Sequence, residues 1–210
     1  MKDYDIYLFD FDGTIVDSFD SMVYIFVNAL ERCGLKGEKD EVLQYSRQPI
    51  SKTFFDKGGK KEGLQEFFDT TIGLLNEEVN LGMNKLFSDT LSSINKLKKK
   101  GSKVGIVTSN SKEHVIDILS HLDVDSNIFD VIVGFEATDK HKPEAEPILK
   151  AIELLNEDIK TSSVVYVGDS LDDMLSAKNA NVDSILIERH NEYGEYKDKK
   201  IESLMELIYD

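Results

Sequence analysis

The stretch Ile6-Tyr7-Leu8-Phe9-Asp10-Phe11-Asp12-Gly13-Thr14 joins a short apolar run to two closely spaced acids. The apolar run predicts a buried strand, and Gly13 permits a sharp turn after it. Asp10, extended at the end of that strand, can point into a cleft, and Asp12 projects from the same side two residues later. The same residues also fit an exposed Asp-Gly turn, so their meaning depends on the rest of the chain.

Further strands are predicted by later runs rich in β-branched residues, at 104–107, 129–133, 164–167 and 185–187. Segments with helical periodicity lie between these runs and begin or end at helix signals such as Ser111 and Gly101. Strands that alternate with helices form parallel sheets, and right-handed crossovers place the helices on both faces. We therefore predict an α/β fold with a Rossmann-like parallel sheet, which binds ligands at the carboxyl ends of its strands.

Residues 16–82 interrupt this alternation, because they contain no convincing strand and have the pattern of successive amphipathic helices. One apolar helical face runs from Val16 to Leu30, and another runs from Leu64 to Val79. We predict an all-helical cap domain at 16–82, inserted into an α/β core formed by residues 1–15 and 83–210.

Composition limits the partners and the compartment. The 210 residues carry a net charge of -15, which opposes binding to nucleic acids and membranes, since both attract clustered Lys and Arg. A single cysteine, Cys33, excludes an internal disulfide, and no stretch has the pattern of a secretory signal or a membrane span. We expect a cytoplasmic protein of undetermined oligomeric state. Its acidity would repel an anionic substrate, so phosphate chemistry would need local cations.

Polar residues follow two more predicted strands. Thr108, Ser109 and Asn110 come directly after residues 104–107. Their hydroxyls, amide and following helix N-terminus suit the oxygens of a phosphate group. Lys142 lies in the loop after residues 129–133, where an ammonium would neutralise a carboxylate and a phosphoryl group together.

A second acidic cluster follows the run at 164–167. Asp169 comes at the strand exit, and Asp173 comes four residues later, one turn into a helix. Carboxylate oxygens suit Mg²⁺. A carboxylate approaching a phosphate dianion at about 4 Å meets a repulsion of about 4 kcal/mol per charge pair, so a cation is needed. Each signal alone has an ordinary explanation, but four on successive strand ends indicate one site.

The motifs and their order resemble those of the haloacid dehalogenase superfamily of aspartate-nucleophile hydrolases, over nearly the whole chain. The four segments that carry the resemblance are Asp10-Phe11-Asp12-Gly13-Thr14-Ile15, Thr108, Lys142-Pro143, and Gly168-Asp169-Ser170 with Asp173. The helical insert after the first segment is similar to the phosphoglycolate-phosphatase-like branch. Ala145 departs from the family pattern, in which a second proline usually follows the Lys-Pro pair.

The resemblance implies a magnesium-dependent phosphatase that hydrolyses small phosphate monoesters through a phosphoaspartyl intermediate. Asp10 would form the intermediate, while Asp12 would protonate the leaving group and then activate water. Mg²⁺ would be held by Asp10, Asp169 and the Asp12 carbonyl, with Asp173 in support. Phosphate-binding residues implied in the same way are Thr14, Thr108, Ser109, Asn110 and Lys142. Asp12 argues against the dehalogenase members, because halide departure needs no proton donor.

Substrate choice is left open. Arg47 lies between two predicted helices of the cap, in a loop that resembles the family's substrate-facing loop, where it would pair with a second anionic group. The substrate is expected to be a small phosphorylated metabolite such as phosphoglycolate, a nucleoside monophosphate, pyrophosphate or a sugar phosphate. The alternatives are a phosphosugar mutase of the same superfamily, a phosphate-storing signalling receiver and a silent binding module. The long helical insert opposes the receiver.

Overall fold

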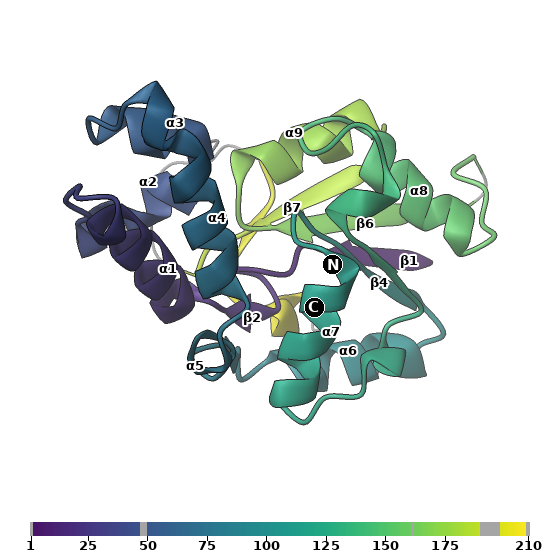
Figure 1. Ribbon diagram of the computed structural model, residues 1–210. Coiled ribbons are helices and arrows are strands. Elements are labelled where there is room, and N and C mark those ends of the chain that lie inside the picture. The colour runs from purple at the N-terminus through teal and green to yellow at the C-terminus, as the bar shows by residue number, and fades with distance from the viewer. Residues whose placement is uncertain (1, 47–49, 161, 190–197, 209–210) are drawn as a thin grey trace. The chain divides into compact units, whose positions relative to one another are not determined.

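The computed structural model describes residues 2–46, 50–160, 162–189 and 198–208. The chain divides into two compact units (Figure 1). The α/β unit comprises Met1–Val16 with Leu86–Asp210, and the helical unit comprises Asp17–Lys85. At the two points where the chain passes between them, strands β2 (Val16–Asp17) and β3 (Lys85–Leu86) pair as a two-stranded sheet.

The α/β unit is built on a six-stranded sheet of order β5-β4-β1-β6-β7-β8. Each pair of neighbouring strands in this order is parallel, which confirms the predicted sheet type. The strands are β1 (Ile6–Phe9), β4 (Lys103–Val107), β5 (Val131–Val133), β6 (Val164–Gly168), β7 (Asp183–Ile187) and β8 (Lys200–Ile201). The two-residue strand β8 was not predicted, because it is too short to show a pattern.

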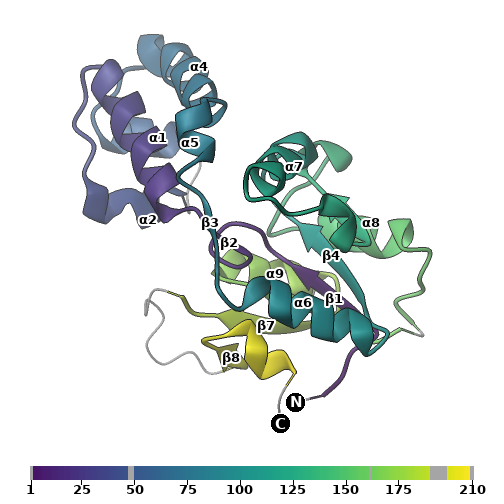
Figure 2. The same cartoon turned by 90° about the horizontal axis from the view of Figure 1, so that it is seen from below.

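Helices cover both faces of this sheet, with α8 and α9 on one side and α6 and α7 on the other (Figure 1). They span α6 (Thr90–Lys99), α7 (Lys112–His121), α8 (Glu146–Leu154) and α9 (Leu171–Asn179). Short 3-10 turns are η3 (Ser126–Ile128), η4 (Phe135–Ala137) and η5 (Leu204–Leu207). Helix α6 packs against η5, which brings the C-terminal segment under the sheet (Figure 2).

Alternation along the central strands explains the two-sided core. Ile6 and Leu8 belong to a buried cluster with Ile148 and Ile152 of α8. Successive side chains of a strand point to opposite faces, so Tyr7 and Phe9 point to the other face of the sheet. A strand buried on both faces needs a continuous apolar run, which is what residues 6–9 supply.

The helical unit contains α1 (Phe19–Arg32), α2 (Val42–Ser46), α3 (Ile50–Asp56), α4 (Leu64–Leu75) and α5 (Glu78–Leu81), with 3-10 turns η1 (Lys39–Glu41) and η2 (Lys61–Gly63). Its own buried core includes Phe54 and Phe67, whose rings stack with centroids 4.9 Å apart. Some details of the predicted helical faces were wrong. Val16 belongs to β2 instead of the first helix, and Val79 is exposed because the chain turns between α4 and α5.

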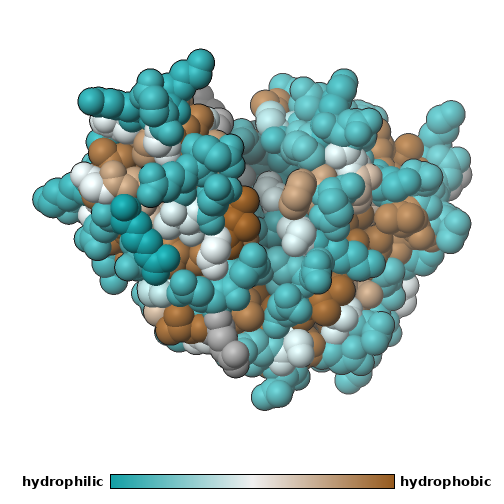
Figure 3. Space-filling view, viewed as in Figure 1, coloured by the Kyte–Doolittle hydropathy of each residue, from teal (hydrophilic) through white to brown (hydrophobic). Residues whose placement is uncertain are grey.

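Hydrophilic side chains are spread over the visible surface of each unit, with apolar residues scattered among them (Figure 3). This surface agrees with a net charge of -15. Among the described residues, every helix is too short or too polar to cross a lipid bilayer.

Candidate active site at the carboxyl edge of the sheet

The carboxyl ends of the central strands meet at one edge of the sheet. Asp10 follows β1, and its backbone N–H donates to the Val167 carbonyl of β6 at 2.8 Å. Thr108 follows β4, and its N–H donates to the Val133 carbonyl of β5 at 3.0 Å. Asp169 follows the last residue of β6. Parallel pairing therefore places residues from three distant parts of the chain side by side.

Lys142 lies within a buried cluster at this edge, and its side chain is 9% exposed. Its Nζ donates to Asp10 Oδ1 at 2.7 Å, to Asp173 Oδ1 at 2.8 Å and to the Tyr166 hydroxyl at 3.3 Å. An ammonium group has three N–H donors, so each of them has an acceptor. The loop lysine is thus oriented by three fixed groups.

Asp173 is held in place by the start of α9. Its Oδ2 accepts hydrogen bonds from the Ser170 N–H at 3.1 Å and the Ser170 hydroxyl at 2.6 Å, in a capping box. The Tyr166 hydroxyl lies 3.1 Å from Asp173 Oδ1 and 2.8 Å from the Val107 carbonyl oxygen. Protein donors already contact both carboxylate oxygens of Asp173, which suits a supporting role.

Three carboxylates converge beside Lys142. Asp10, Asp169 and Asp173 offer oxygen atoms that lie within 4.8 Å of one another. With one ammonium among three carboxylates, the ionised cluster carries a net charge of minus two. Hard oxygen donors with an excess of negative charge fit a divalent cation such as Mg²⁺. The Gly13 backbone lies close to Asp169, because a Cβ on Gly13 would be only 2.4 Å from Asp169 Oδ2. The φ of Gly13 is 72°.

Burial and charge compete at the nucleophile candidate. Burial raises the pKa of Asp10 well above its usual range, and the neighbouring Asp173 and Asp169 raise it further, although Lys142 opposes the shift. Burial alone would lower the pKa of Lys142, but Asp10 and Asp173 reverse that effect and hold its pKa well above the ordinary value. The lysine therefore stays charged, and added positive charge would favour the ionised form of Asp10.

Asp12 is held by a residue from the next strand end. The Asn110 side-chain amide donates to Asp12 Oδ2 at 2.6 Å. This contact orients the second acid, and the predicted binding of phosphate by Asn110 stays a prediction. The Asn110 backbone N–H donates to Thr108 Oγ1 at 3.1 Å, and Ser109 between them is exposed. The turn after β4 therefore presents one exposed hydroxyl and positions Asp12.

Two more residues, Thr14 and Arg47, were predicted to contact the substrate. Thr14 is fully buried, and its Oγ1 has no hydrogen-bond partner among the described residues. The Thr14 carbonyl accepts a hydrogen bond from Arg189, and the predicted contact of Thr14 with phosphate stays a prediction. Arg47 lies outside the described residues.

Sequence reasoning missed Tyr166 and the contact between Asn110 and Asp12. Tyr166 stands among valines in β6, so it was counted only as part of an apolar run. The available signal was a single polar-tipped side chain in a strand buried on both faces, because such a hydroxyl needs a partner.

Comparison with known proteins identifies the family. The sequence profile of the haloacid dehalogenase-like hydrolases matches residues 7–187. The chain belongs to this family. A relative from Caldanaerobacter subterraneus, named as a candidate pyrophosphatase PpaX, is 36% identical over 183 residues, which cover 86% of this chain and 80% of the relative.

Solved structures of other proteins share the architecture. A candidate hydrolase of this family from Bacteroides fragilis has a TM-score of 0.86 and 28% identity, covering 98% of this chain and 100% of its own. A candidate phosphoglycolate phosphatase from Lactobacillus plantarum has a TM-score of 0.79 and 18% identity, covering 98% of each chain. The second likeness shows the fold alone.

Proposed function

We propose that this protein is a magnesium-dependent phosphatase of small phosphorylated metabolites, with Asp10 as the nucleophile. One observation carries the proposal: Lys142 Nζ lies 2.7 Å from Asp10 Oδ1, within the cluster that includes Asp169 and Asp173. A buried carboxylate beside a charged ammonium, at the ligand-binding edge of the sheet, is an arrangement suited to attack on an anionic centre.

In the proposed reaction, a carboxylate oxygen of Asp10 attacks phosphorus, and the ester oxygen leaves with a proton from Asp12. The bond from phosphorus to the leaving oxygen breaks as the acyl phosphate forms. Asp12, now ionised, then accepts a proton from a water molecule that attacks phosphorus and releases inorganic phosphate from Asp10. The hydrogen bond from Asn110 supports the carboxylate of Asp12 in an orientation for both proton transfers.

Residues around Asp10 support the remaining roles. Lys142 would balance charge on the transferring group, and Thr108 at the end of β4 would contact its oxygens. Mg²⁺ would be held by Asp10, Asp169 and the Asp12 carbonyl, with Asp173 in support. When bound, the metal supplies positive charge that reduces repulsion between the carboxylate and the phosphoryl group.

The helical unit is proposed to be the cap that contacts the leaving group, with Arg47 as a candidate contact. Relatives are named as pyrophosphatase PpaX, and a structural neighbour is named as a phosphoglycolate phosphatase. Both names denote small anionic phosphate compounds, so pyrophosphate and phosphoglycolate are the first substrates to compare. Catalytic efficiency across a panel of phosphorylated metabolites would rank them.

The decisive test is hydrolysis of p-nitrophenyl phosphate with Mg²⁺, with a chelator and by the Asp10→Asn variant. We expect turnover only by the unmodified protein with Mg²⁺, and a loss of at least roughly 10³-fold in the variant. Asp172→Asn is the matched control, since this exposed acid lies in the same acidic segment and should keep full activity. Comparable activity in Asp10→Asn would reject the mechanism. One phosphate bound per chain without turnover would favour a receiver.

A further inference from the structure

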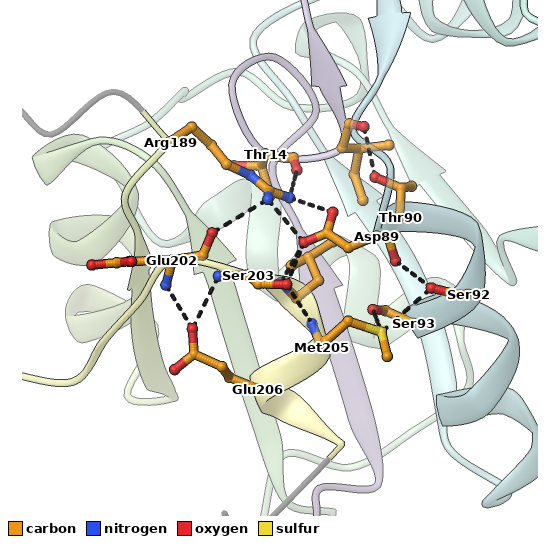
Figure 4. Close-up of polar contacts among 12 residues, drawn as sticks. Thr14, Asp89, Thr90, Ser92, Ser93, Arg189, Glu202, Ser203, Met205 and Glu206 are labelled. Atoms are coloured by element: carbon orange, nitrogen blue, oxygen red, sulfur yellow. Dashed lines mark hydrogen bonds and ion pairs between the residues drawn. The ribbon is translucent and has the colours of Figure 1, made fainter.

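A second charged network connects Asp89 and Arg189 (Figure 4). The guanidinium Nη1 donates to Asp89 Oδ2 and Nη2 donates to Asp89 Oδ1, both at 2.9 Å. The two side chains are 8% and 11% exposed for Arg189 and Asp89. The Arg189 guanidinium carbon also lies 4.1 Å from the centroid of the Phe87 ring. Fork-shaped pairing and stacking together define the guanidinium position closely.

Asp89 connects this pair to the C-terminal segment. Its Oδ2 also accepts hydrogen bonds from the Ser203 hydroxyl at 2.7 Å and the Leu204 N–H at 2.9 Å. Taking two charges out of water costs free energy, and replacement of such a pair by apolar residues is often neutral or stabilising. A contribution to the stability of the fold is therefore a weak explanation for the Asp89–Arg189 pair. The other hydrogen bonds of Arg189 indicate a further role.

Both terminal nitrogens of Arg189 also reach backbone carbonyls, whereas its Nε has no hydrogen-bond partner among the described residues. Nη2 donates to the Thr14 carbonyl at 3.1 Å, and Nη1 donates to the Glu202 carbonyl at 3.4 Å. The next carbonyl along the first segment, that of Ile15, accepts from the Thr90 hydroxyl at 2.9 Å. Thus Thr90, at the start of α6, and Arg189, two positions after β7, donate to consecutive carbonyls of the turn that follows Asp10.

That turn behaves as one closed unit. The N–H groups of Ile15 and Val16 donate to the Phe11 carbonyl at 2.9 and 3.0 Å, and the Gly13 N–H donates to the Val16 carbonyl at 2.8 Å. A shift at Thr14 would therefore move the residues before it. There is little room for such movement, because a Cβ on Gly13 would already lie 2.4 Å from Asp169 Oδ2.

We propose that Arg189, oriented by Asp89, is a positioning residue that anchors the Thr14 carbonyl and so keeps Asp12 and Gly13 in register with Asn110 and Asp169. The catalytic part of this inference rests on the phosphatase function proposed above. A lysine at position 189 would not replace the arginine, because one ammonium cannot reproduce the two-pronged contact with Asp89 while also reaching the Thr14 carbonyl.

The test compares Arg189→Gln with Glu188→Gln. Glu188 is the preceding residue, is buried and forms its own ion pair with Lys200, so it is a matched control for loss of a buried charge pair. We expect Arg189→Gln to lower kcat by about 10- to 100-fold with KM changed by less than about threefold, as for misplaced reacting groups. Glu188→Gln should keep kcat within about twofold of the unmodified protein, even if its Tm falls as far as the Tm of Arg189→Gln.

Amide hydrogen exchange supplies a readout that needs no activity. The N–H groups of residues 13–16 should exchange faster in Arg189→Gln than in the unmodified protein. Their exchange rates should be unchanged in Glu188→Gln. Unchanged exchange in Arg189→Gln, or equal losses of kcat in both variants, would overturn the proposal. Faster exchange with full kcat would also overturn it, because the turn would then move without consequence for catalysis.

Two milder variants keep the test decisive if Arg189→Gln does not fold. Ser203→Ala removes one hydrogen bond to Asp89 and leaves Arg189 in place, and Arg189→Lys keeps the charge. We expect both to lower kcat, with Arg189→Lys the more affected, and full activity in Arg189→Lys would refute the inference. If the unmodified protein hydrolyses no phosphate ester, the proposed function fails, while exchange at residues 13–16 still decides whether Arg189 anchors the turn.

Discussion

Replacing Tyr166 by phenylalanine removes one oxygen atom from the buried cluster and leaves the ring in place. That oxygen accepts from Lys142 Nζ at 3.3 Å and lies 2.8 Å from the Val107 carbonyl oxygen. The ammonium would keep its contacts with Asp10 and Asp173 but lose its third acceptor. We therefore expect the fold to persist with a less well oriented lysine.

The size of the effect follows from the kind of hydrogen bond that is lost. A hydrogen bond to a charged group contributes about 1.5–3 kcal/mol, and the 3.3 Å contact is the longest of the three made by Lys142, so the lower end applies. If about 1.4 kcal/mol of this is expressed in the transition state, kcat falls about tenfold. The free energy of unfolding should also fall by about 1 kcal/mol, because the Val107 carbonyl loses a donor.

Tyr7→Phe is the matched control. Tyr7 is equally buried on the neighbouring strand β1, and its hydroxyl accepts a hydrogen bond from the Tyr4 N–H at 3.2 Å. Tyr7 pairs with Val165 in the sheet, so it points to the face opposite Tyr166. We expect a similar loss of stability but kcat within about twofold of the unmodified protein.

The assay is steady-state hydrolysis of p-nitrophenyl phosphate with Mg²⁺, corrected for the folded fraction from urea unfolding. The ratio of vanadate to orthophosphate affinity should fall only in Tyr166→Phe, because vanadate resembles the transition state more closely. If Tyr166→Phe keeps full kcat, or if both variants lose activity in proportion to stability, the role assigned to the hydroxyl is refuted.

Two further predictions concern the turn after β1 and the buried ion pair. Gly13→Ala should lower activity and Mg²⁺ affinity together, since the new Cβ would meet Asp169 and φ is positive; unchanged Mg²⁺ binding by calorimetry would contradict this. Burial alone would raise the pKa of Asp89, but hydrogen bonds from Arg189 and Ser203 outweigh it and hold that pKa below its ordinary value. A lowered pKa in the folded state means that the stabilisation is present above the unfolded pKa of about 3.9 and is lost as pH falls through the folded pKa. The excess stability of the unmodified protein over Asp89→Asn, measured by urea unfolding, should therefore shrink between neutral pH and pH of about 3, and a constant difference would exclude this linkage.

Local sequence was sufficient for the sheet and for the edge of it at which the candidate site residues gather. The apolar run at residues 6–9 has to be a strand buried on both faces, and the acids that follow have to emerge at its carboxyl end. The same reasoning placed Lys142 and Asp169 beside Asp10, because parallel strands align their carboxyl ends. Helix faces were less well predicted: Ile72 and Val79 have the spacing of core residues but are exposed.

The exact hydrogen-bond partners of several side chains at this edge could not be predicted from the residue pattern. The hydrogen bond from Asn110 to Asp12 and the complete burial of Thr14 are two such features. Spacing along a strand shows which face a side chain occupies, but it does not show which partner from another segment meets it there.

The linear order of residues was enough to determine the α/β fold, the strand ends that carry polar groups and the chemistry those groups suit. Only folding in three dimensions decided that Tyr166 orients Lys142 and that Arg189 and Asp89, 100 residues apart, meet beneath the Thr14 carbonyl. The physical reason is that strand and helix patterns arise from the local periodicity of apolar side chains. Buried hydrogen bonds and ion pairs instead depend on which groups are excluded from water together.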